Sequence, residues 1–229
     1  RGALRKLPRG VVAVPAAPAP GQAAVTAPPR VFADGLVMPL GLLPYKDGAL
    51  VQYGADIRHF MPELFGMHNG DGELCAVAGV RRAHLQPLFL ERYLDEPIEP
   101  LISAAADRPV DRTGIVEVGN LAASDTGSAR LSIIAITWLL AMGGLEWVAF
   151  TGNIGLVNSF HRLGLKPVTL CVADPQRLGD ERHHWGSYYE SQPWVHVGNI
   201  RAGFIHLRNM GLFSRLGLPT TIEDASHVA

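Results

Sequence analysis

The chain has 229 residues, which is enough for one domain with a substantial core. Its formal net charge of -1 at pH 7 provides no global basic field, so nucleic-acid binding is not expected. The longest apolar stretch, about residues 131–145, contains Ser132 and Thr137. It is shorter than the roughly 18 apolar residues of a membrane-spanning helix, so integral membrane association is not expected either.

The first fifty residues differ in composition from the rest of the chain. The stretch VVAVPAAPAPGQAAVTAPPR is rich in Ala and Pro, and the start RGALRKLPRG is basic. Because proline fixes φ and removes a backbone donor, residues 1–50 are predicted to be disordered or extended. A targeting peptide is the alternative for the basic start. Residues 51–215 are predicted to form the folded domain and residues 216–229 a C-terminal tail.

Strand and helix signals begin after residue 53. The Asp-Gly pair in HNGDGE predicts a hairpin turn before a strand in ELCAVAGVRRA, and therefore antiparallel strands there. The stretch QPLFLERYLDEPIEPLISAAA has helical spacing interrupted by Pro97 and Pro100, which predicts a helix, a break and a second short helix. GIVEVGNLAAS predicts a strand over about residues 115–122, in which Gly119 indicates a bulge.

The second half alternates helices and strands. SDTGSARLSIIAITWLLAMGG predicts a capped helix that ends at a glycine pair, and LEWVAFTG a short buried strand. TGNIGLVNSFHRLGL predicts a helix with Asn153 as N-cap and Gly164 as its left-handed terminator. KPVTLCVAD and WVHVGNI predict two further strands. This order predicts parallel pairing through right-handed crossovers here, and a mixed α/β sheet overall.

Cysteine and histidine usage bounds the chemistry. Cys75 and Cys171 lie in apolar runs, which indicates buried thiols in a reducing compartment and predicts a cytoplasmic protein. The adjacent His183 and His184 would point to different sides of a loop, and no Cys or carboxylate lies at ligand spacing, so no metal site is expected.

Residues 117–142 form a strand–loop–helix unit that can hold an anion. The amides of Gly127, Ser128, Ala129 and Arg130 would point outward at the helix N-terminus, where the helix dipole favours negative charge. The Arg130 side chain adds a positive charge. The unit is either a phosphate or pyrophosphate site or an ordinary capped helix with a surface arginine.

A resemblance to known families adds to these observations. TGNIGLVNSFHRLGL resembles the last motif of the GNAT acyltransferase superfamily, with Asn153, Leu156, Phe160 and RLGL in the motif's places. The segments FMPELFG, AVAGVR, PLFLERYLDEPIE, IVEVGNLA, WVAFTGN, NSFHRLGL and WGSYY, over about residues 53–200, resemble the thermostable hemolysin family. That family is grouped with GNAT-like folds and is similar in layout to acyl-homoserine-lactone synthases. The resemblance implies an α/β fold: a mixed, mostly antiparallel sheet with a splayed parallel pair and flanking helices.

The resemblance also implies an acyltransferase. Such an enzyme moves an acyl group from a thioester carrier, acyl-CoA or acyl carrier protein, to a small-molecule amine. The motif's asparagine lies beside the pantetheine arm of the carrier, which assigns Asn153 to donor binding. Asn158, one helix turn on, is expected in the same tunnel or as a solvated polar residue. The backbone amides of Leu121 and Ala123 are expected to pair with the arm.

The chain departs from the GNAT pattern at two places. The usual Arg/Gln-x-x-Gly-x-Gly phosphate loop is absent, because the stretch Ser128 to Ile133 contains no glycine pair. An acyl carrier protein is therefore the alternative donor to coenzyme A. Phe160 replaces the tyrosine that often protonates the leaving thiolate, so that proton must come from another group or from water.

Acyl transfer to an amine requires a base, groups that polarise the thioester carbonyl, and alignment of the reactants. Glu117 is the candidate base, because a partly buried carboxylate on the central strand would have a raised pKa. The alternative is a structural ion pair with a nearby arginine. Asn120 follows the bulge and is expected to hold the acceptor or the carbonyl. The pair Arg81–Arg82 is either a docking point for an acidic partner or a solvated strand end.

Two other functions compete with the enzyme. The family name suggests a membrane-active lytic protein, but the chain contains no long amphipathic helix with a basic face. A non-catalytic binding module with the same fold would explain the missing glycine pair and Phe160. The aromatic stretch WGSYYESQP is expected either to cover the acyl or acceptor pocket or to pack against the sheet. Oligomeric state is not readable from the sequence.

Overall fold

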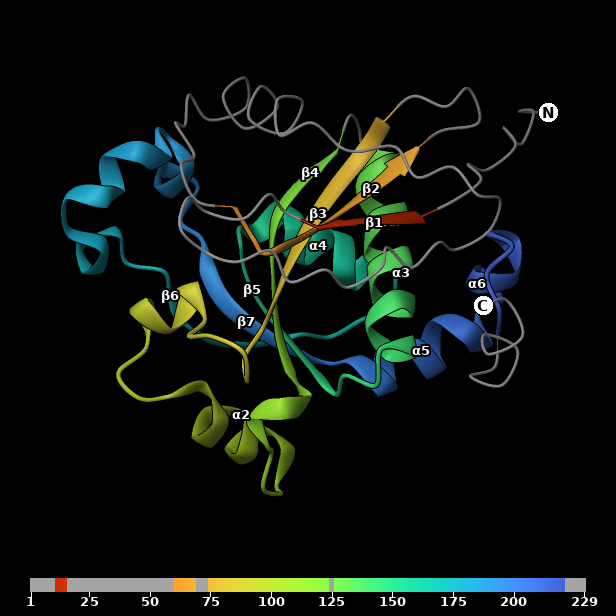
Figure 1. Cartoon of the computed structure of the whole chain (residues 1–229), viewed down its shortest axis with the longest axis horizontal. Coiled ribbons are helices and arrows are strands. Elements are labelled where there is room, and N and C mark those ends of the chain that lie inside the picture. Colours follow the sequence, from red (N-terminus) through yellow and green to blue (C-terminus); the bar gives the residue numbers. More distant parts are fainter. Residues whose placement is uncertain (1–10, 16–59, 69–73, 124–125, 221–229) are drawn as a thin grey trace.

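The computed structural model describes residues 11–15, 60–68, 74–123 and 126–220, and Figure 1 shows their arrangement. These residues form a seven-stranded sheet in the order β1-β2-β3-β4-β5-β7-β6. The strands are β1 (Val11–Pro15), β2 (Glu63–His68), β3 (Leu74–Arg82), β4 (Ile115–Ala123), β5 (Trp147–Gly152), β6 (Val168–Val172) and β7 (Trp194–Asn199). In this sheet β4 and β5 run parallel, and every other neighbouring pair is antiparallel.

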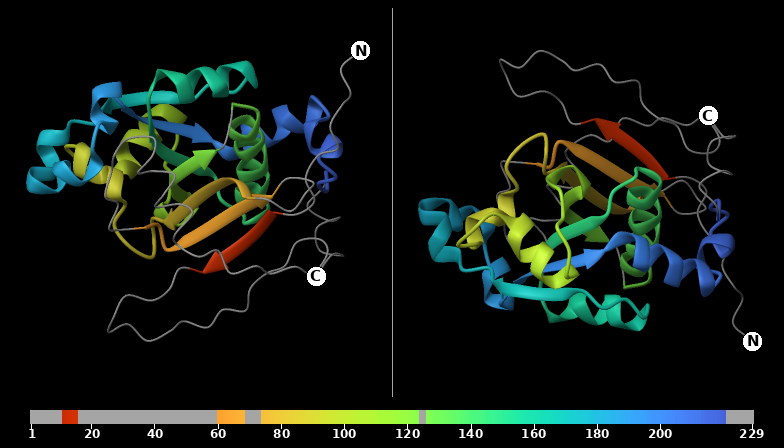
Figure 2. Two further views of the ribbon diagram at one scale, coloured as in Figure 1. Left: turned by 90° about the horizontal axis from the view of Figure 1, so that it is seen from above. Right: turned by 90° about the horizontal axis from the view of Figure 1, so that it is seen from below.

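Helices flank the sheet, and this confirms the mixed α/β architecture, mostly antiparallel with one parallel pair, that the resemblance implied. The α-helices are α2 (Ile98–Ala106), α3 (Thr126–Met142), α4 (Ile154–Arg162), α5 (Ile200–Asn209) and α6 (Leu212–Arg215). Short 3-10 helices are η1 (Phe89–Tyr93), η2 (Arg112–Gly114), η3 (Pro175–Trp185) and η4 (Tyr188–Ser191). Figure 2 shows the twisted sheet and the helices around it in two further views.

The Ala/Pro-rich N-terminal segment enters the described fold through β1. This strand pairs with β2 in antiparallel register, Val11 opposite Met67, and forms one edge of the sheet. The other residues of the predicted 1–50 segment lie outside the described part of the chain, and so do residues 221–229 of the predicted tail.

The predicted hairpin is confirmed, because β2 and β3 pair antiparallel with Leu64 opposite Gly79, although the turn residues 69–73 lie outside the described part. The predicted break at Pro97 is confirmed too, since Pro97 is the N-cap of α2. Pro100 lies in the first turn of α2, where backbone N–H groups have no intrahelical partner and a missing one costs little. The element before the break is the short 3-10 helix η1 instead of a longer helix.

The helix ends follow local signals. α3 ends before Gly143 and Gly144, and Gly144 has a φ of 73°. Asn153 caps α4 by accepting a hydrogen bond from Leu156 N at 3.1 Å. Gly164 has a φ of 73°, and the adjacent amide of Leu165 donates to Phe160 O at 3.0 Å, which closes the last turn as predicted.

The predicted parallel pairing of the last strands is wrong in one respect. β4 and β5 are parallel neighbours, but β7 lies between β5 and β6 and pairs antiparallel with both. Burial explains this order. Val195 and Val197 of β7 are fully buried, whereas Val168 and Val172 of β6 are 43% and 45% exposed. β7, whose valines are buried, takes the interior position, and β6 becomes the edge.

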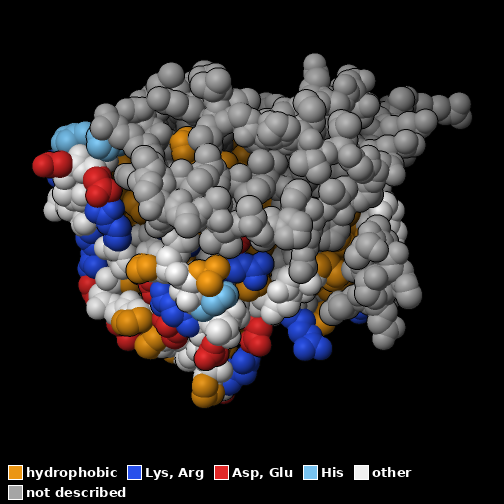
Figure 3. All heavy atoms as spheres, viewed as in Figure 1, with side chains coloured by type: hydrophobic (Ala, Val, Ile, Leu, Met, Phe, Trp, Pro, Cys, Tyr) orange, Lys and Arg blue, Asp and Glu red, His pale blue; other side chains and the backbone are white. Residues whose placement is uncertain are grey.

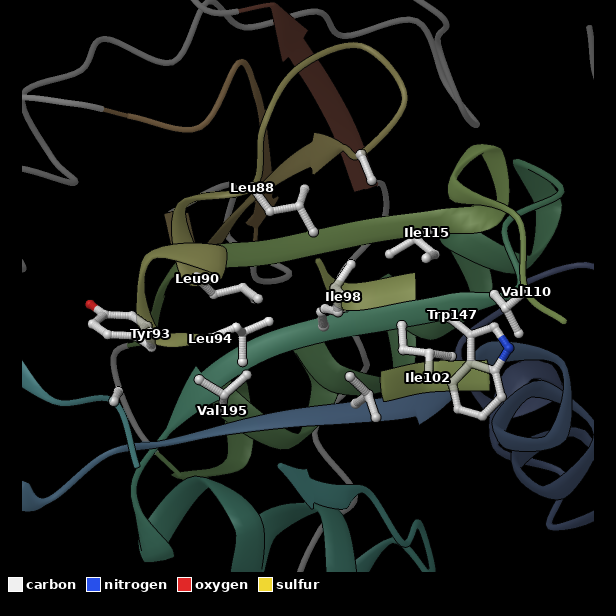
Figure 4. Packing of buried hydrophobic residues seen from close by; sticks show 14 of the residues in the cluster. Leu88, Leu90, Tyr93, Leu94, Ile98, Ile102, Val110, Ile115, Trp147 and Val195 are labelled. Carbon is white, nitrogen blue, oxygen red and sulfur yellow. The ribbon is translucent and has the colours of Figure 1, made fainter. Parts of the chain in front are cut away.

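Two hydrophobic layers cover the sheet. On one face, residues of η1, α2 and their connections pack over Ile115, Trp147 and Val195, as Figure 4 shows. On the other face, α3 packs over Val116 and joins α4 and α5 in a second cluster around Trp138. Ile115 and Val116 therefore point to opposite faces of β4. By the period of a strand, Glu117 lies on the η1 face and Val118 on the α3 face.

Candidate active site

The parallel strands β4 and β5 separate at the centre of the sheet. Their pairing begins at Ile115 opposite Trp147 and stops at Val118 opposite Phe150. β4 continues to Ala123 beside β3, whereas β5 ends at Gly152. Within the described chain, residues 119–123 of β4 therefore have no strand partner on their β5 side. This opening exposes a row of backbone N–H and C=O groups.

A cavity of about 840 Å³ occupies this opening and reaches both faces of the sheet. One half, here called the helix-side half, is mainly apolar and is lined by Ala129, Ile133, Ile136, Leu156, Ser159 and Phe160. The other, here called the carboxylate-side half, is lined by Met61, Arg81, Phe89, Glu117, Trp185 and Tyr188. The cavity thus joins an apolar compartment to one with charged and aromatic side chains, a combination common in ligand sites.

The central strand places Glu117 in the carboxylate-side half. Its side chain is almost fully buried, at 3% exposure. Oε2 accepts a hydrogen bond from Phe89 N at 2.7 Å, and Oε1 accepts one from Leu90 N at 3.0 Å. Burial raises the pKa of Glu117 to about 7, against the opposing effects of the Arg81 charge and the two amides. This carboxyl group can therefore gain or lose a proton near neutral pH.

Both readings of Glu117 have support in its surroundings. Arg81 lies directly opposite Glu117 in the β3–β4 register, and its Nη1 is 3.8 Å from Glu117 Oε2. The prediction of a nearby arginine is confirmed, but at this separation the two groups form an ion pair without a hydrogen bond. Arg81 itself has 15% side-chain exposure, so the alternative of a solvated strand end is wrong for Arg81. Arg82, on the opposite face, is 34% exposed and pairs with Glu63 at 3.5 Å.

The β4 bulge lies one residue after the predicted position. Gly79 faces Gly119 and Val77 faces Ala122, so β4 has one more residue than β3 in this interval. Asn120 has a φ of 50° and takes the left-handed conformation of the bulge. Its Oδ1 accepts a hydrogen bond from Met61 N at 2.7 Å. Asn120 therefore anchors the segment before β2 and also lines the cavity.

Met61 packs over both Gly79 and Gly119, but with different parts of its side chain. The two glycines should therefore differ in their tolerance of alanine. A Cβ at Gly79 would lie 2.5 Å from Met61 Cβ, whereas a Cβ at Gly119 would meet the terminal Met61 Cε at 2.4 Å. The methionine end can rotate away, but its Cβ cannot move without the backbone. We expect Gly79→Ala to lower the free energy of unfolding by about 1–3 kcal/mol and Gly119→Ala by clearly less. Chemical denaturation of both variants measures this, and equal losses would contradict it.

The predicted donor-binding residues divide into two groups. Leu121, Ala123, Ala129 and Asn153 line the cavity. Asn153 lines the cavity, but its side-chain oxygen already accepts the hydrogen bond that caps α4. The predicted residues that are not among the lining residues are Gly127, Ser128, Arg130 and Asn158. Of these, Ser128 is buried, and Arg130 and Asn158 are exposed.

An aromatic cluster forms one wall of the cavity. The sequence indicated its residues only as the aromatic stretch WGSYYESQP. Trp185 lies 5.5 Å from both Phe89 and Tyr188, measured between ring centroids. Tyr93 and Tyr189 share a hydrogen bond of 2.6 Å between their hydroxyl groups. Tyr188 OH donates to Thr151 Oγ1 at 3.3 Å, which ties the cluster to the end of β5. The stretch WGSYY therefore both packs on the η1 face and lines the cavity.

The described part of the chain also bears on metal binding and on membrane spanning. In the described ranges, no group of three or more His, Cys, Asp and Glu side chains is placed to hold a metal ion. None of the helices in those ranges has both the length and the apolar character that crossing a bilayer requires. Cys75 and Cys171 form no disulfide and are partly buried, and burial raises the pKa of the Cys171 thiol. In the face that Figure 3 shows, basic and acidic side chains are interspersed over the coloured, described part.

Several solved protein structures are similar to this chain at low sequence identity. FeeM, an N-acyl amino acid synthase from uncultured soil microbes, has 15% identity and a TM-score of 0.49, with 75% of this chain and 91% of that chain covered. TofI in a ternary complex with an inhibitor and MTA has 15% identity and a TM-score of 0.47, with 80% and 90% covered. BjaI, a CoA-dependent acyl-homoserine lactone synthase, has 16% identity and a TM-score of 0.43, with 69% and 65% covered.

A comparison with curated protein sequences finds no match. The family model described as thermostable hemolysin matches residues 49–204. This range contains β2 to β7 and nearly all of the residues that line the cavity. The matched range is more than half of the chain, and its motifs appear in the order noted in the sequence, so the chain belongs to the thermostable hemolysin family.

Proposed function

We propose that this chain is an N-acyltransferase that moves an acyl group from a thioester carrier, coenzyme A or acyl carrier protein, to a small-molecule amine. The observation that carries the proposal is the position of Glu117. It is a buried carboxyl group with a pKa raised to about 7, and it lines a cavity at the point where two parallel strands separate. Such a group can accept the proton that an ammonium must lose before it attacks.

The donor fits the opening between the strands. The β5-side backbone groups of residues 119–123 have no strand partner in the described chain, and the pantetheine arm of both carriers contains amide groups that can pair with a strand edge. The helix-side half offers apolar contacts from α3 and α4 for an acyl chain. The amine then approaches from the carboxylate-side half, where Glu117 lies.

The reaction balances with this one carboxylate. Glu117 takes a proton from the ammonium, and the neutral nitrogen attacks the thioester carbonyl carbon. The new C–N bond forms, the C–S bond breaks, and a second proton of the nitrogen goes to the leaving thiolate directly or through water. Phe160 lines the cavity but has no hydroxyl group to donate, so this proton route replaces the tyrosine of other GNAT enzymes.

A binding and turnover experiment tests this function. Purified protein is unfolded thermally with acyl-CoAs of several lengths, free coenzyme A and an acyl carrier protein. A donor at a hundredfold excess over its Kd stabilises the native state by about 2.7 kcal/mol. Addition of amines to the binding donor should then release free thiol. A protein that binds no donor and releases no thiol would instead favour the binding-module or lytic function.

A bulky residue in the cavity should separate donor binding from folding. Ser159 lines the helix-side half, whereas His161, on the same helix, is exposed and is not among the lining residues. We expect Ser159→Phe to weaken donor binding by about tenfold or more, about 1.4 kcal/mol, because the added ring would occupy cavity volume that the donor needs. His161→Phe is the matched control and should bind the donor as the wild type does. Equal affinities in both variants would place the donor elsewhere.

A further inference from the structure

We propose that Arg81 binds the carboxylate of the acceptor, so that the acceptor is an α-amino acid with an apolar or aromatic side chain. This inference rests on the proposed acyl transfer and specifies its acceptor. It starts from the state of the Arg81 side chain. Arg81 Nε is buried and has no hydrogen-bond partner among the described residues. Its guanidinium forms an ion pair with Glu117 at 3.8 Å, which is longer than a hydrogen bond.

Other arginines of the fold show what Arg81 lacks. Arg112 donates to Glu91 Oε1 and Oε2, both at 2.7 Å, and Arg92 donates to Glu181 at 2.6 Å. Glu117 does not serve Arg81 in this way, because its oxygens accept from Phe89 N and Leu90 N while Arg81 Nη1 stays 3.8 Å from Oε2. A guanidinium has five N–H donors, and burying them without acceptors is costly. An anionic group of a ligand would supply the missing acceptors.

The spacing of the charges selects the type of anion. An α-amino acid carries its ammonium and its carboxylate on the same carbon atom. Glu117 and Arg81 present the opposite charges side by side, 3.8 Å apart, on neighbouring strands of the carboxylate-side half. A guanidinium binds a carboxylate through two parallel N–H···O bonds, which also fixes the orientation of the ligand. The ammonium of such an acceptor would therefore lie beside Glu117.

The remaining wall suits an apolar side chain. Phe89, Trp185 and Tyr188 line the same half of the cavity, as does Met61, which packs over Gly119. Aromatic side chains bury large apolar areas and stack on other rings. In the reaction, the carboxylate of the acceptor stays bound to Arg81 and unchanged, while the nitrogen on the same carbon atom forms the amide bond.

The test compares acceptors that differ only in the carboxylate. Wild-type protein, Arg81→Gln and the control Arg82→Gln are assayed with a saturating donor and with phenylalanine, its carboxamide or phenylethylamine. We expect the wild type to prefer phenylalanine over its carboxamide by about 10- to 100-fold in kcat/KM, as charged hydrogen bonds allow. Arg81→Gln should lose this preference through a higher KM for phenylalanine. Arg81 also lowers the pKa of Glu117, so any change in kcat from the altered base should be shared by all three acceptors. Arg82→Gln should keep it.

Two results would overturn the inference while acyl transfer stands. They are equal use of the acid and the carboxamide by the wild type, and an equal loss for all three acceptors in Arg81→Gln. Calorimetry with phenylalanine and its carboxamide covers the case in which no acceptor is acylated. Carboxylate-dependent binding that Arg81→Gln abolishes would then support the site although the proposed reaction had failed. Absence of such binding would overturn the site as well.

Discussion

Glu117→Gln is expected to lower kcat for acyl transfer by about 10²- to 10⁴-fold, the usual contribution of a general base. The variant should still bind the acyl donor, because we propose that the donor arm and acyl chain contact β4 beyond Glu117 and the helix-side half of the cavity. Single-turnover measurement of thiol release gives the rate, and a thermal shift with the donor gives binding. Full activity in this variant would exclude Glu117 as the base.

The substitution also changes local hydrogen bonding, so it needs a structural control. Glu117 accepts from two backbone amides, one on each oxygen. Glutamine has a single acceptor oxygen, and its NH₂ group would face one of these amides. We therefore expect some loss of stability as well. Circular dichroism and the retained donor shift separate an inactive folded protein from an unfolded one.

The pH dependence of the wild type provides a second, independent measure of Glu117. With its pKa raised to about 7 by burial, kcat/KM should rise with pH and level off above about 7. Stability should move in the opposite direction. The folded-state pKa lies above the ordinary value of 4.5, so the native state binds this proton more tightly. The stabilising contribution is complete below pH 4.5 and is lost as the pH rises through about 7. Glu117→Gln should remove both dependences.

Arg112→Met is expected to destabilise the fold by about 2 kcal/mol, between the values for exposed and buried charge pairs, because Arg112 has 28% side-chain exposure. Arg112 donates to both oxygens of Glu91 at 2.7 Å, to Glu99 at 2.9 Å and to Ala83 O at 2.8 Å. It thereby connects the end of β3, η1 and α2. Loss of this cation leaves Glu91, with 16% side-chain exposure, without its charge partner. Chemical denaturation measures the change.

An exposed arginine is the matched control for Arg112. Arg108 pairs with Glu146 at 2.7 Å, but both side chains are about half exposed, at 50% and 52%. Arg108→Met should cost no more than about 1 kcal/mol, as for other surface pairs. Similar losses in the two variants would show that the Arg112 network adds nothing to an ordinary surface ion pair.

The Arg112 effect should also depend on pH. Burial raises the pKa of Glu91, but the hydrogen bonds from Arg112, Leu88 N and Ile98 N outweigh it and hold this pKa below 4.5. A lowered folded-state pKa stabilises the protein above the ordinary value, and this contribution is lost as the pH falls through the lowered pKa. The difference between wild type and Arg112→Met should therefore be full above pH 4.5 and shrink in more acidic solution.

The Arg112 network also bears on the proposed catalysis, because η1 supplies the amides that hold Glu117. Phe89 N and Leu90 N belong to this short helix, and Glu91 follows directly. If η1 shifts in Arg112→Met, Glu117 loses donors that favour its charged form, and its pKa should rise further. The pH at which kcat/KM levels off should then move upward, which a pH–rate profile of the variant measures.

Features that depend on neighbouring residues were predictable from the chain. The ends of α4 follow from Asn153 and Gly164, whose capping bonds span three to five residues. The hairpin of β2 and β3, the break at Pro97 and the glycine-terminated α3 are equally local. The family motifs then added the splayed parallel pair and Glu117 as a candidate base.

Features that depend on residues far apart in the chain could not be predicted from the sequence. The place of β7 between β5 and β6 is a choice among strands that are all apolar, and burial of Val195 and Val197 settles it after the chain has returned from η3 and η4. Arg81 and Arg82 are chemically alike and adjacent, yet strand alternation buries one beside Glu117 and leaves the other partly exposed with Glu63. The raised pKa of Glu117 likewise comes from burial, and even the Leu90 amide that contacts this carboxyl group lies 27 residues away along the chain. Local hydrogen bonds can be read along the chain, but desolvation requires knowing which segments meet in space.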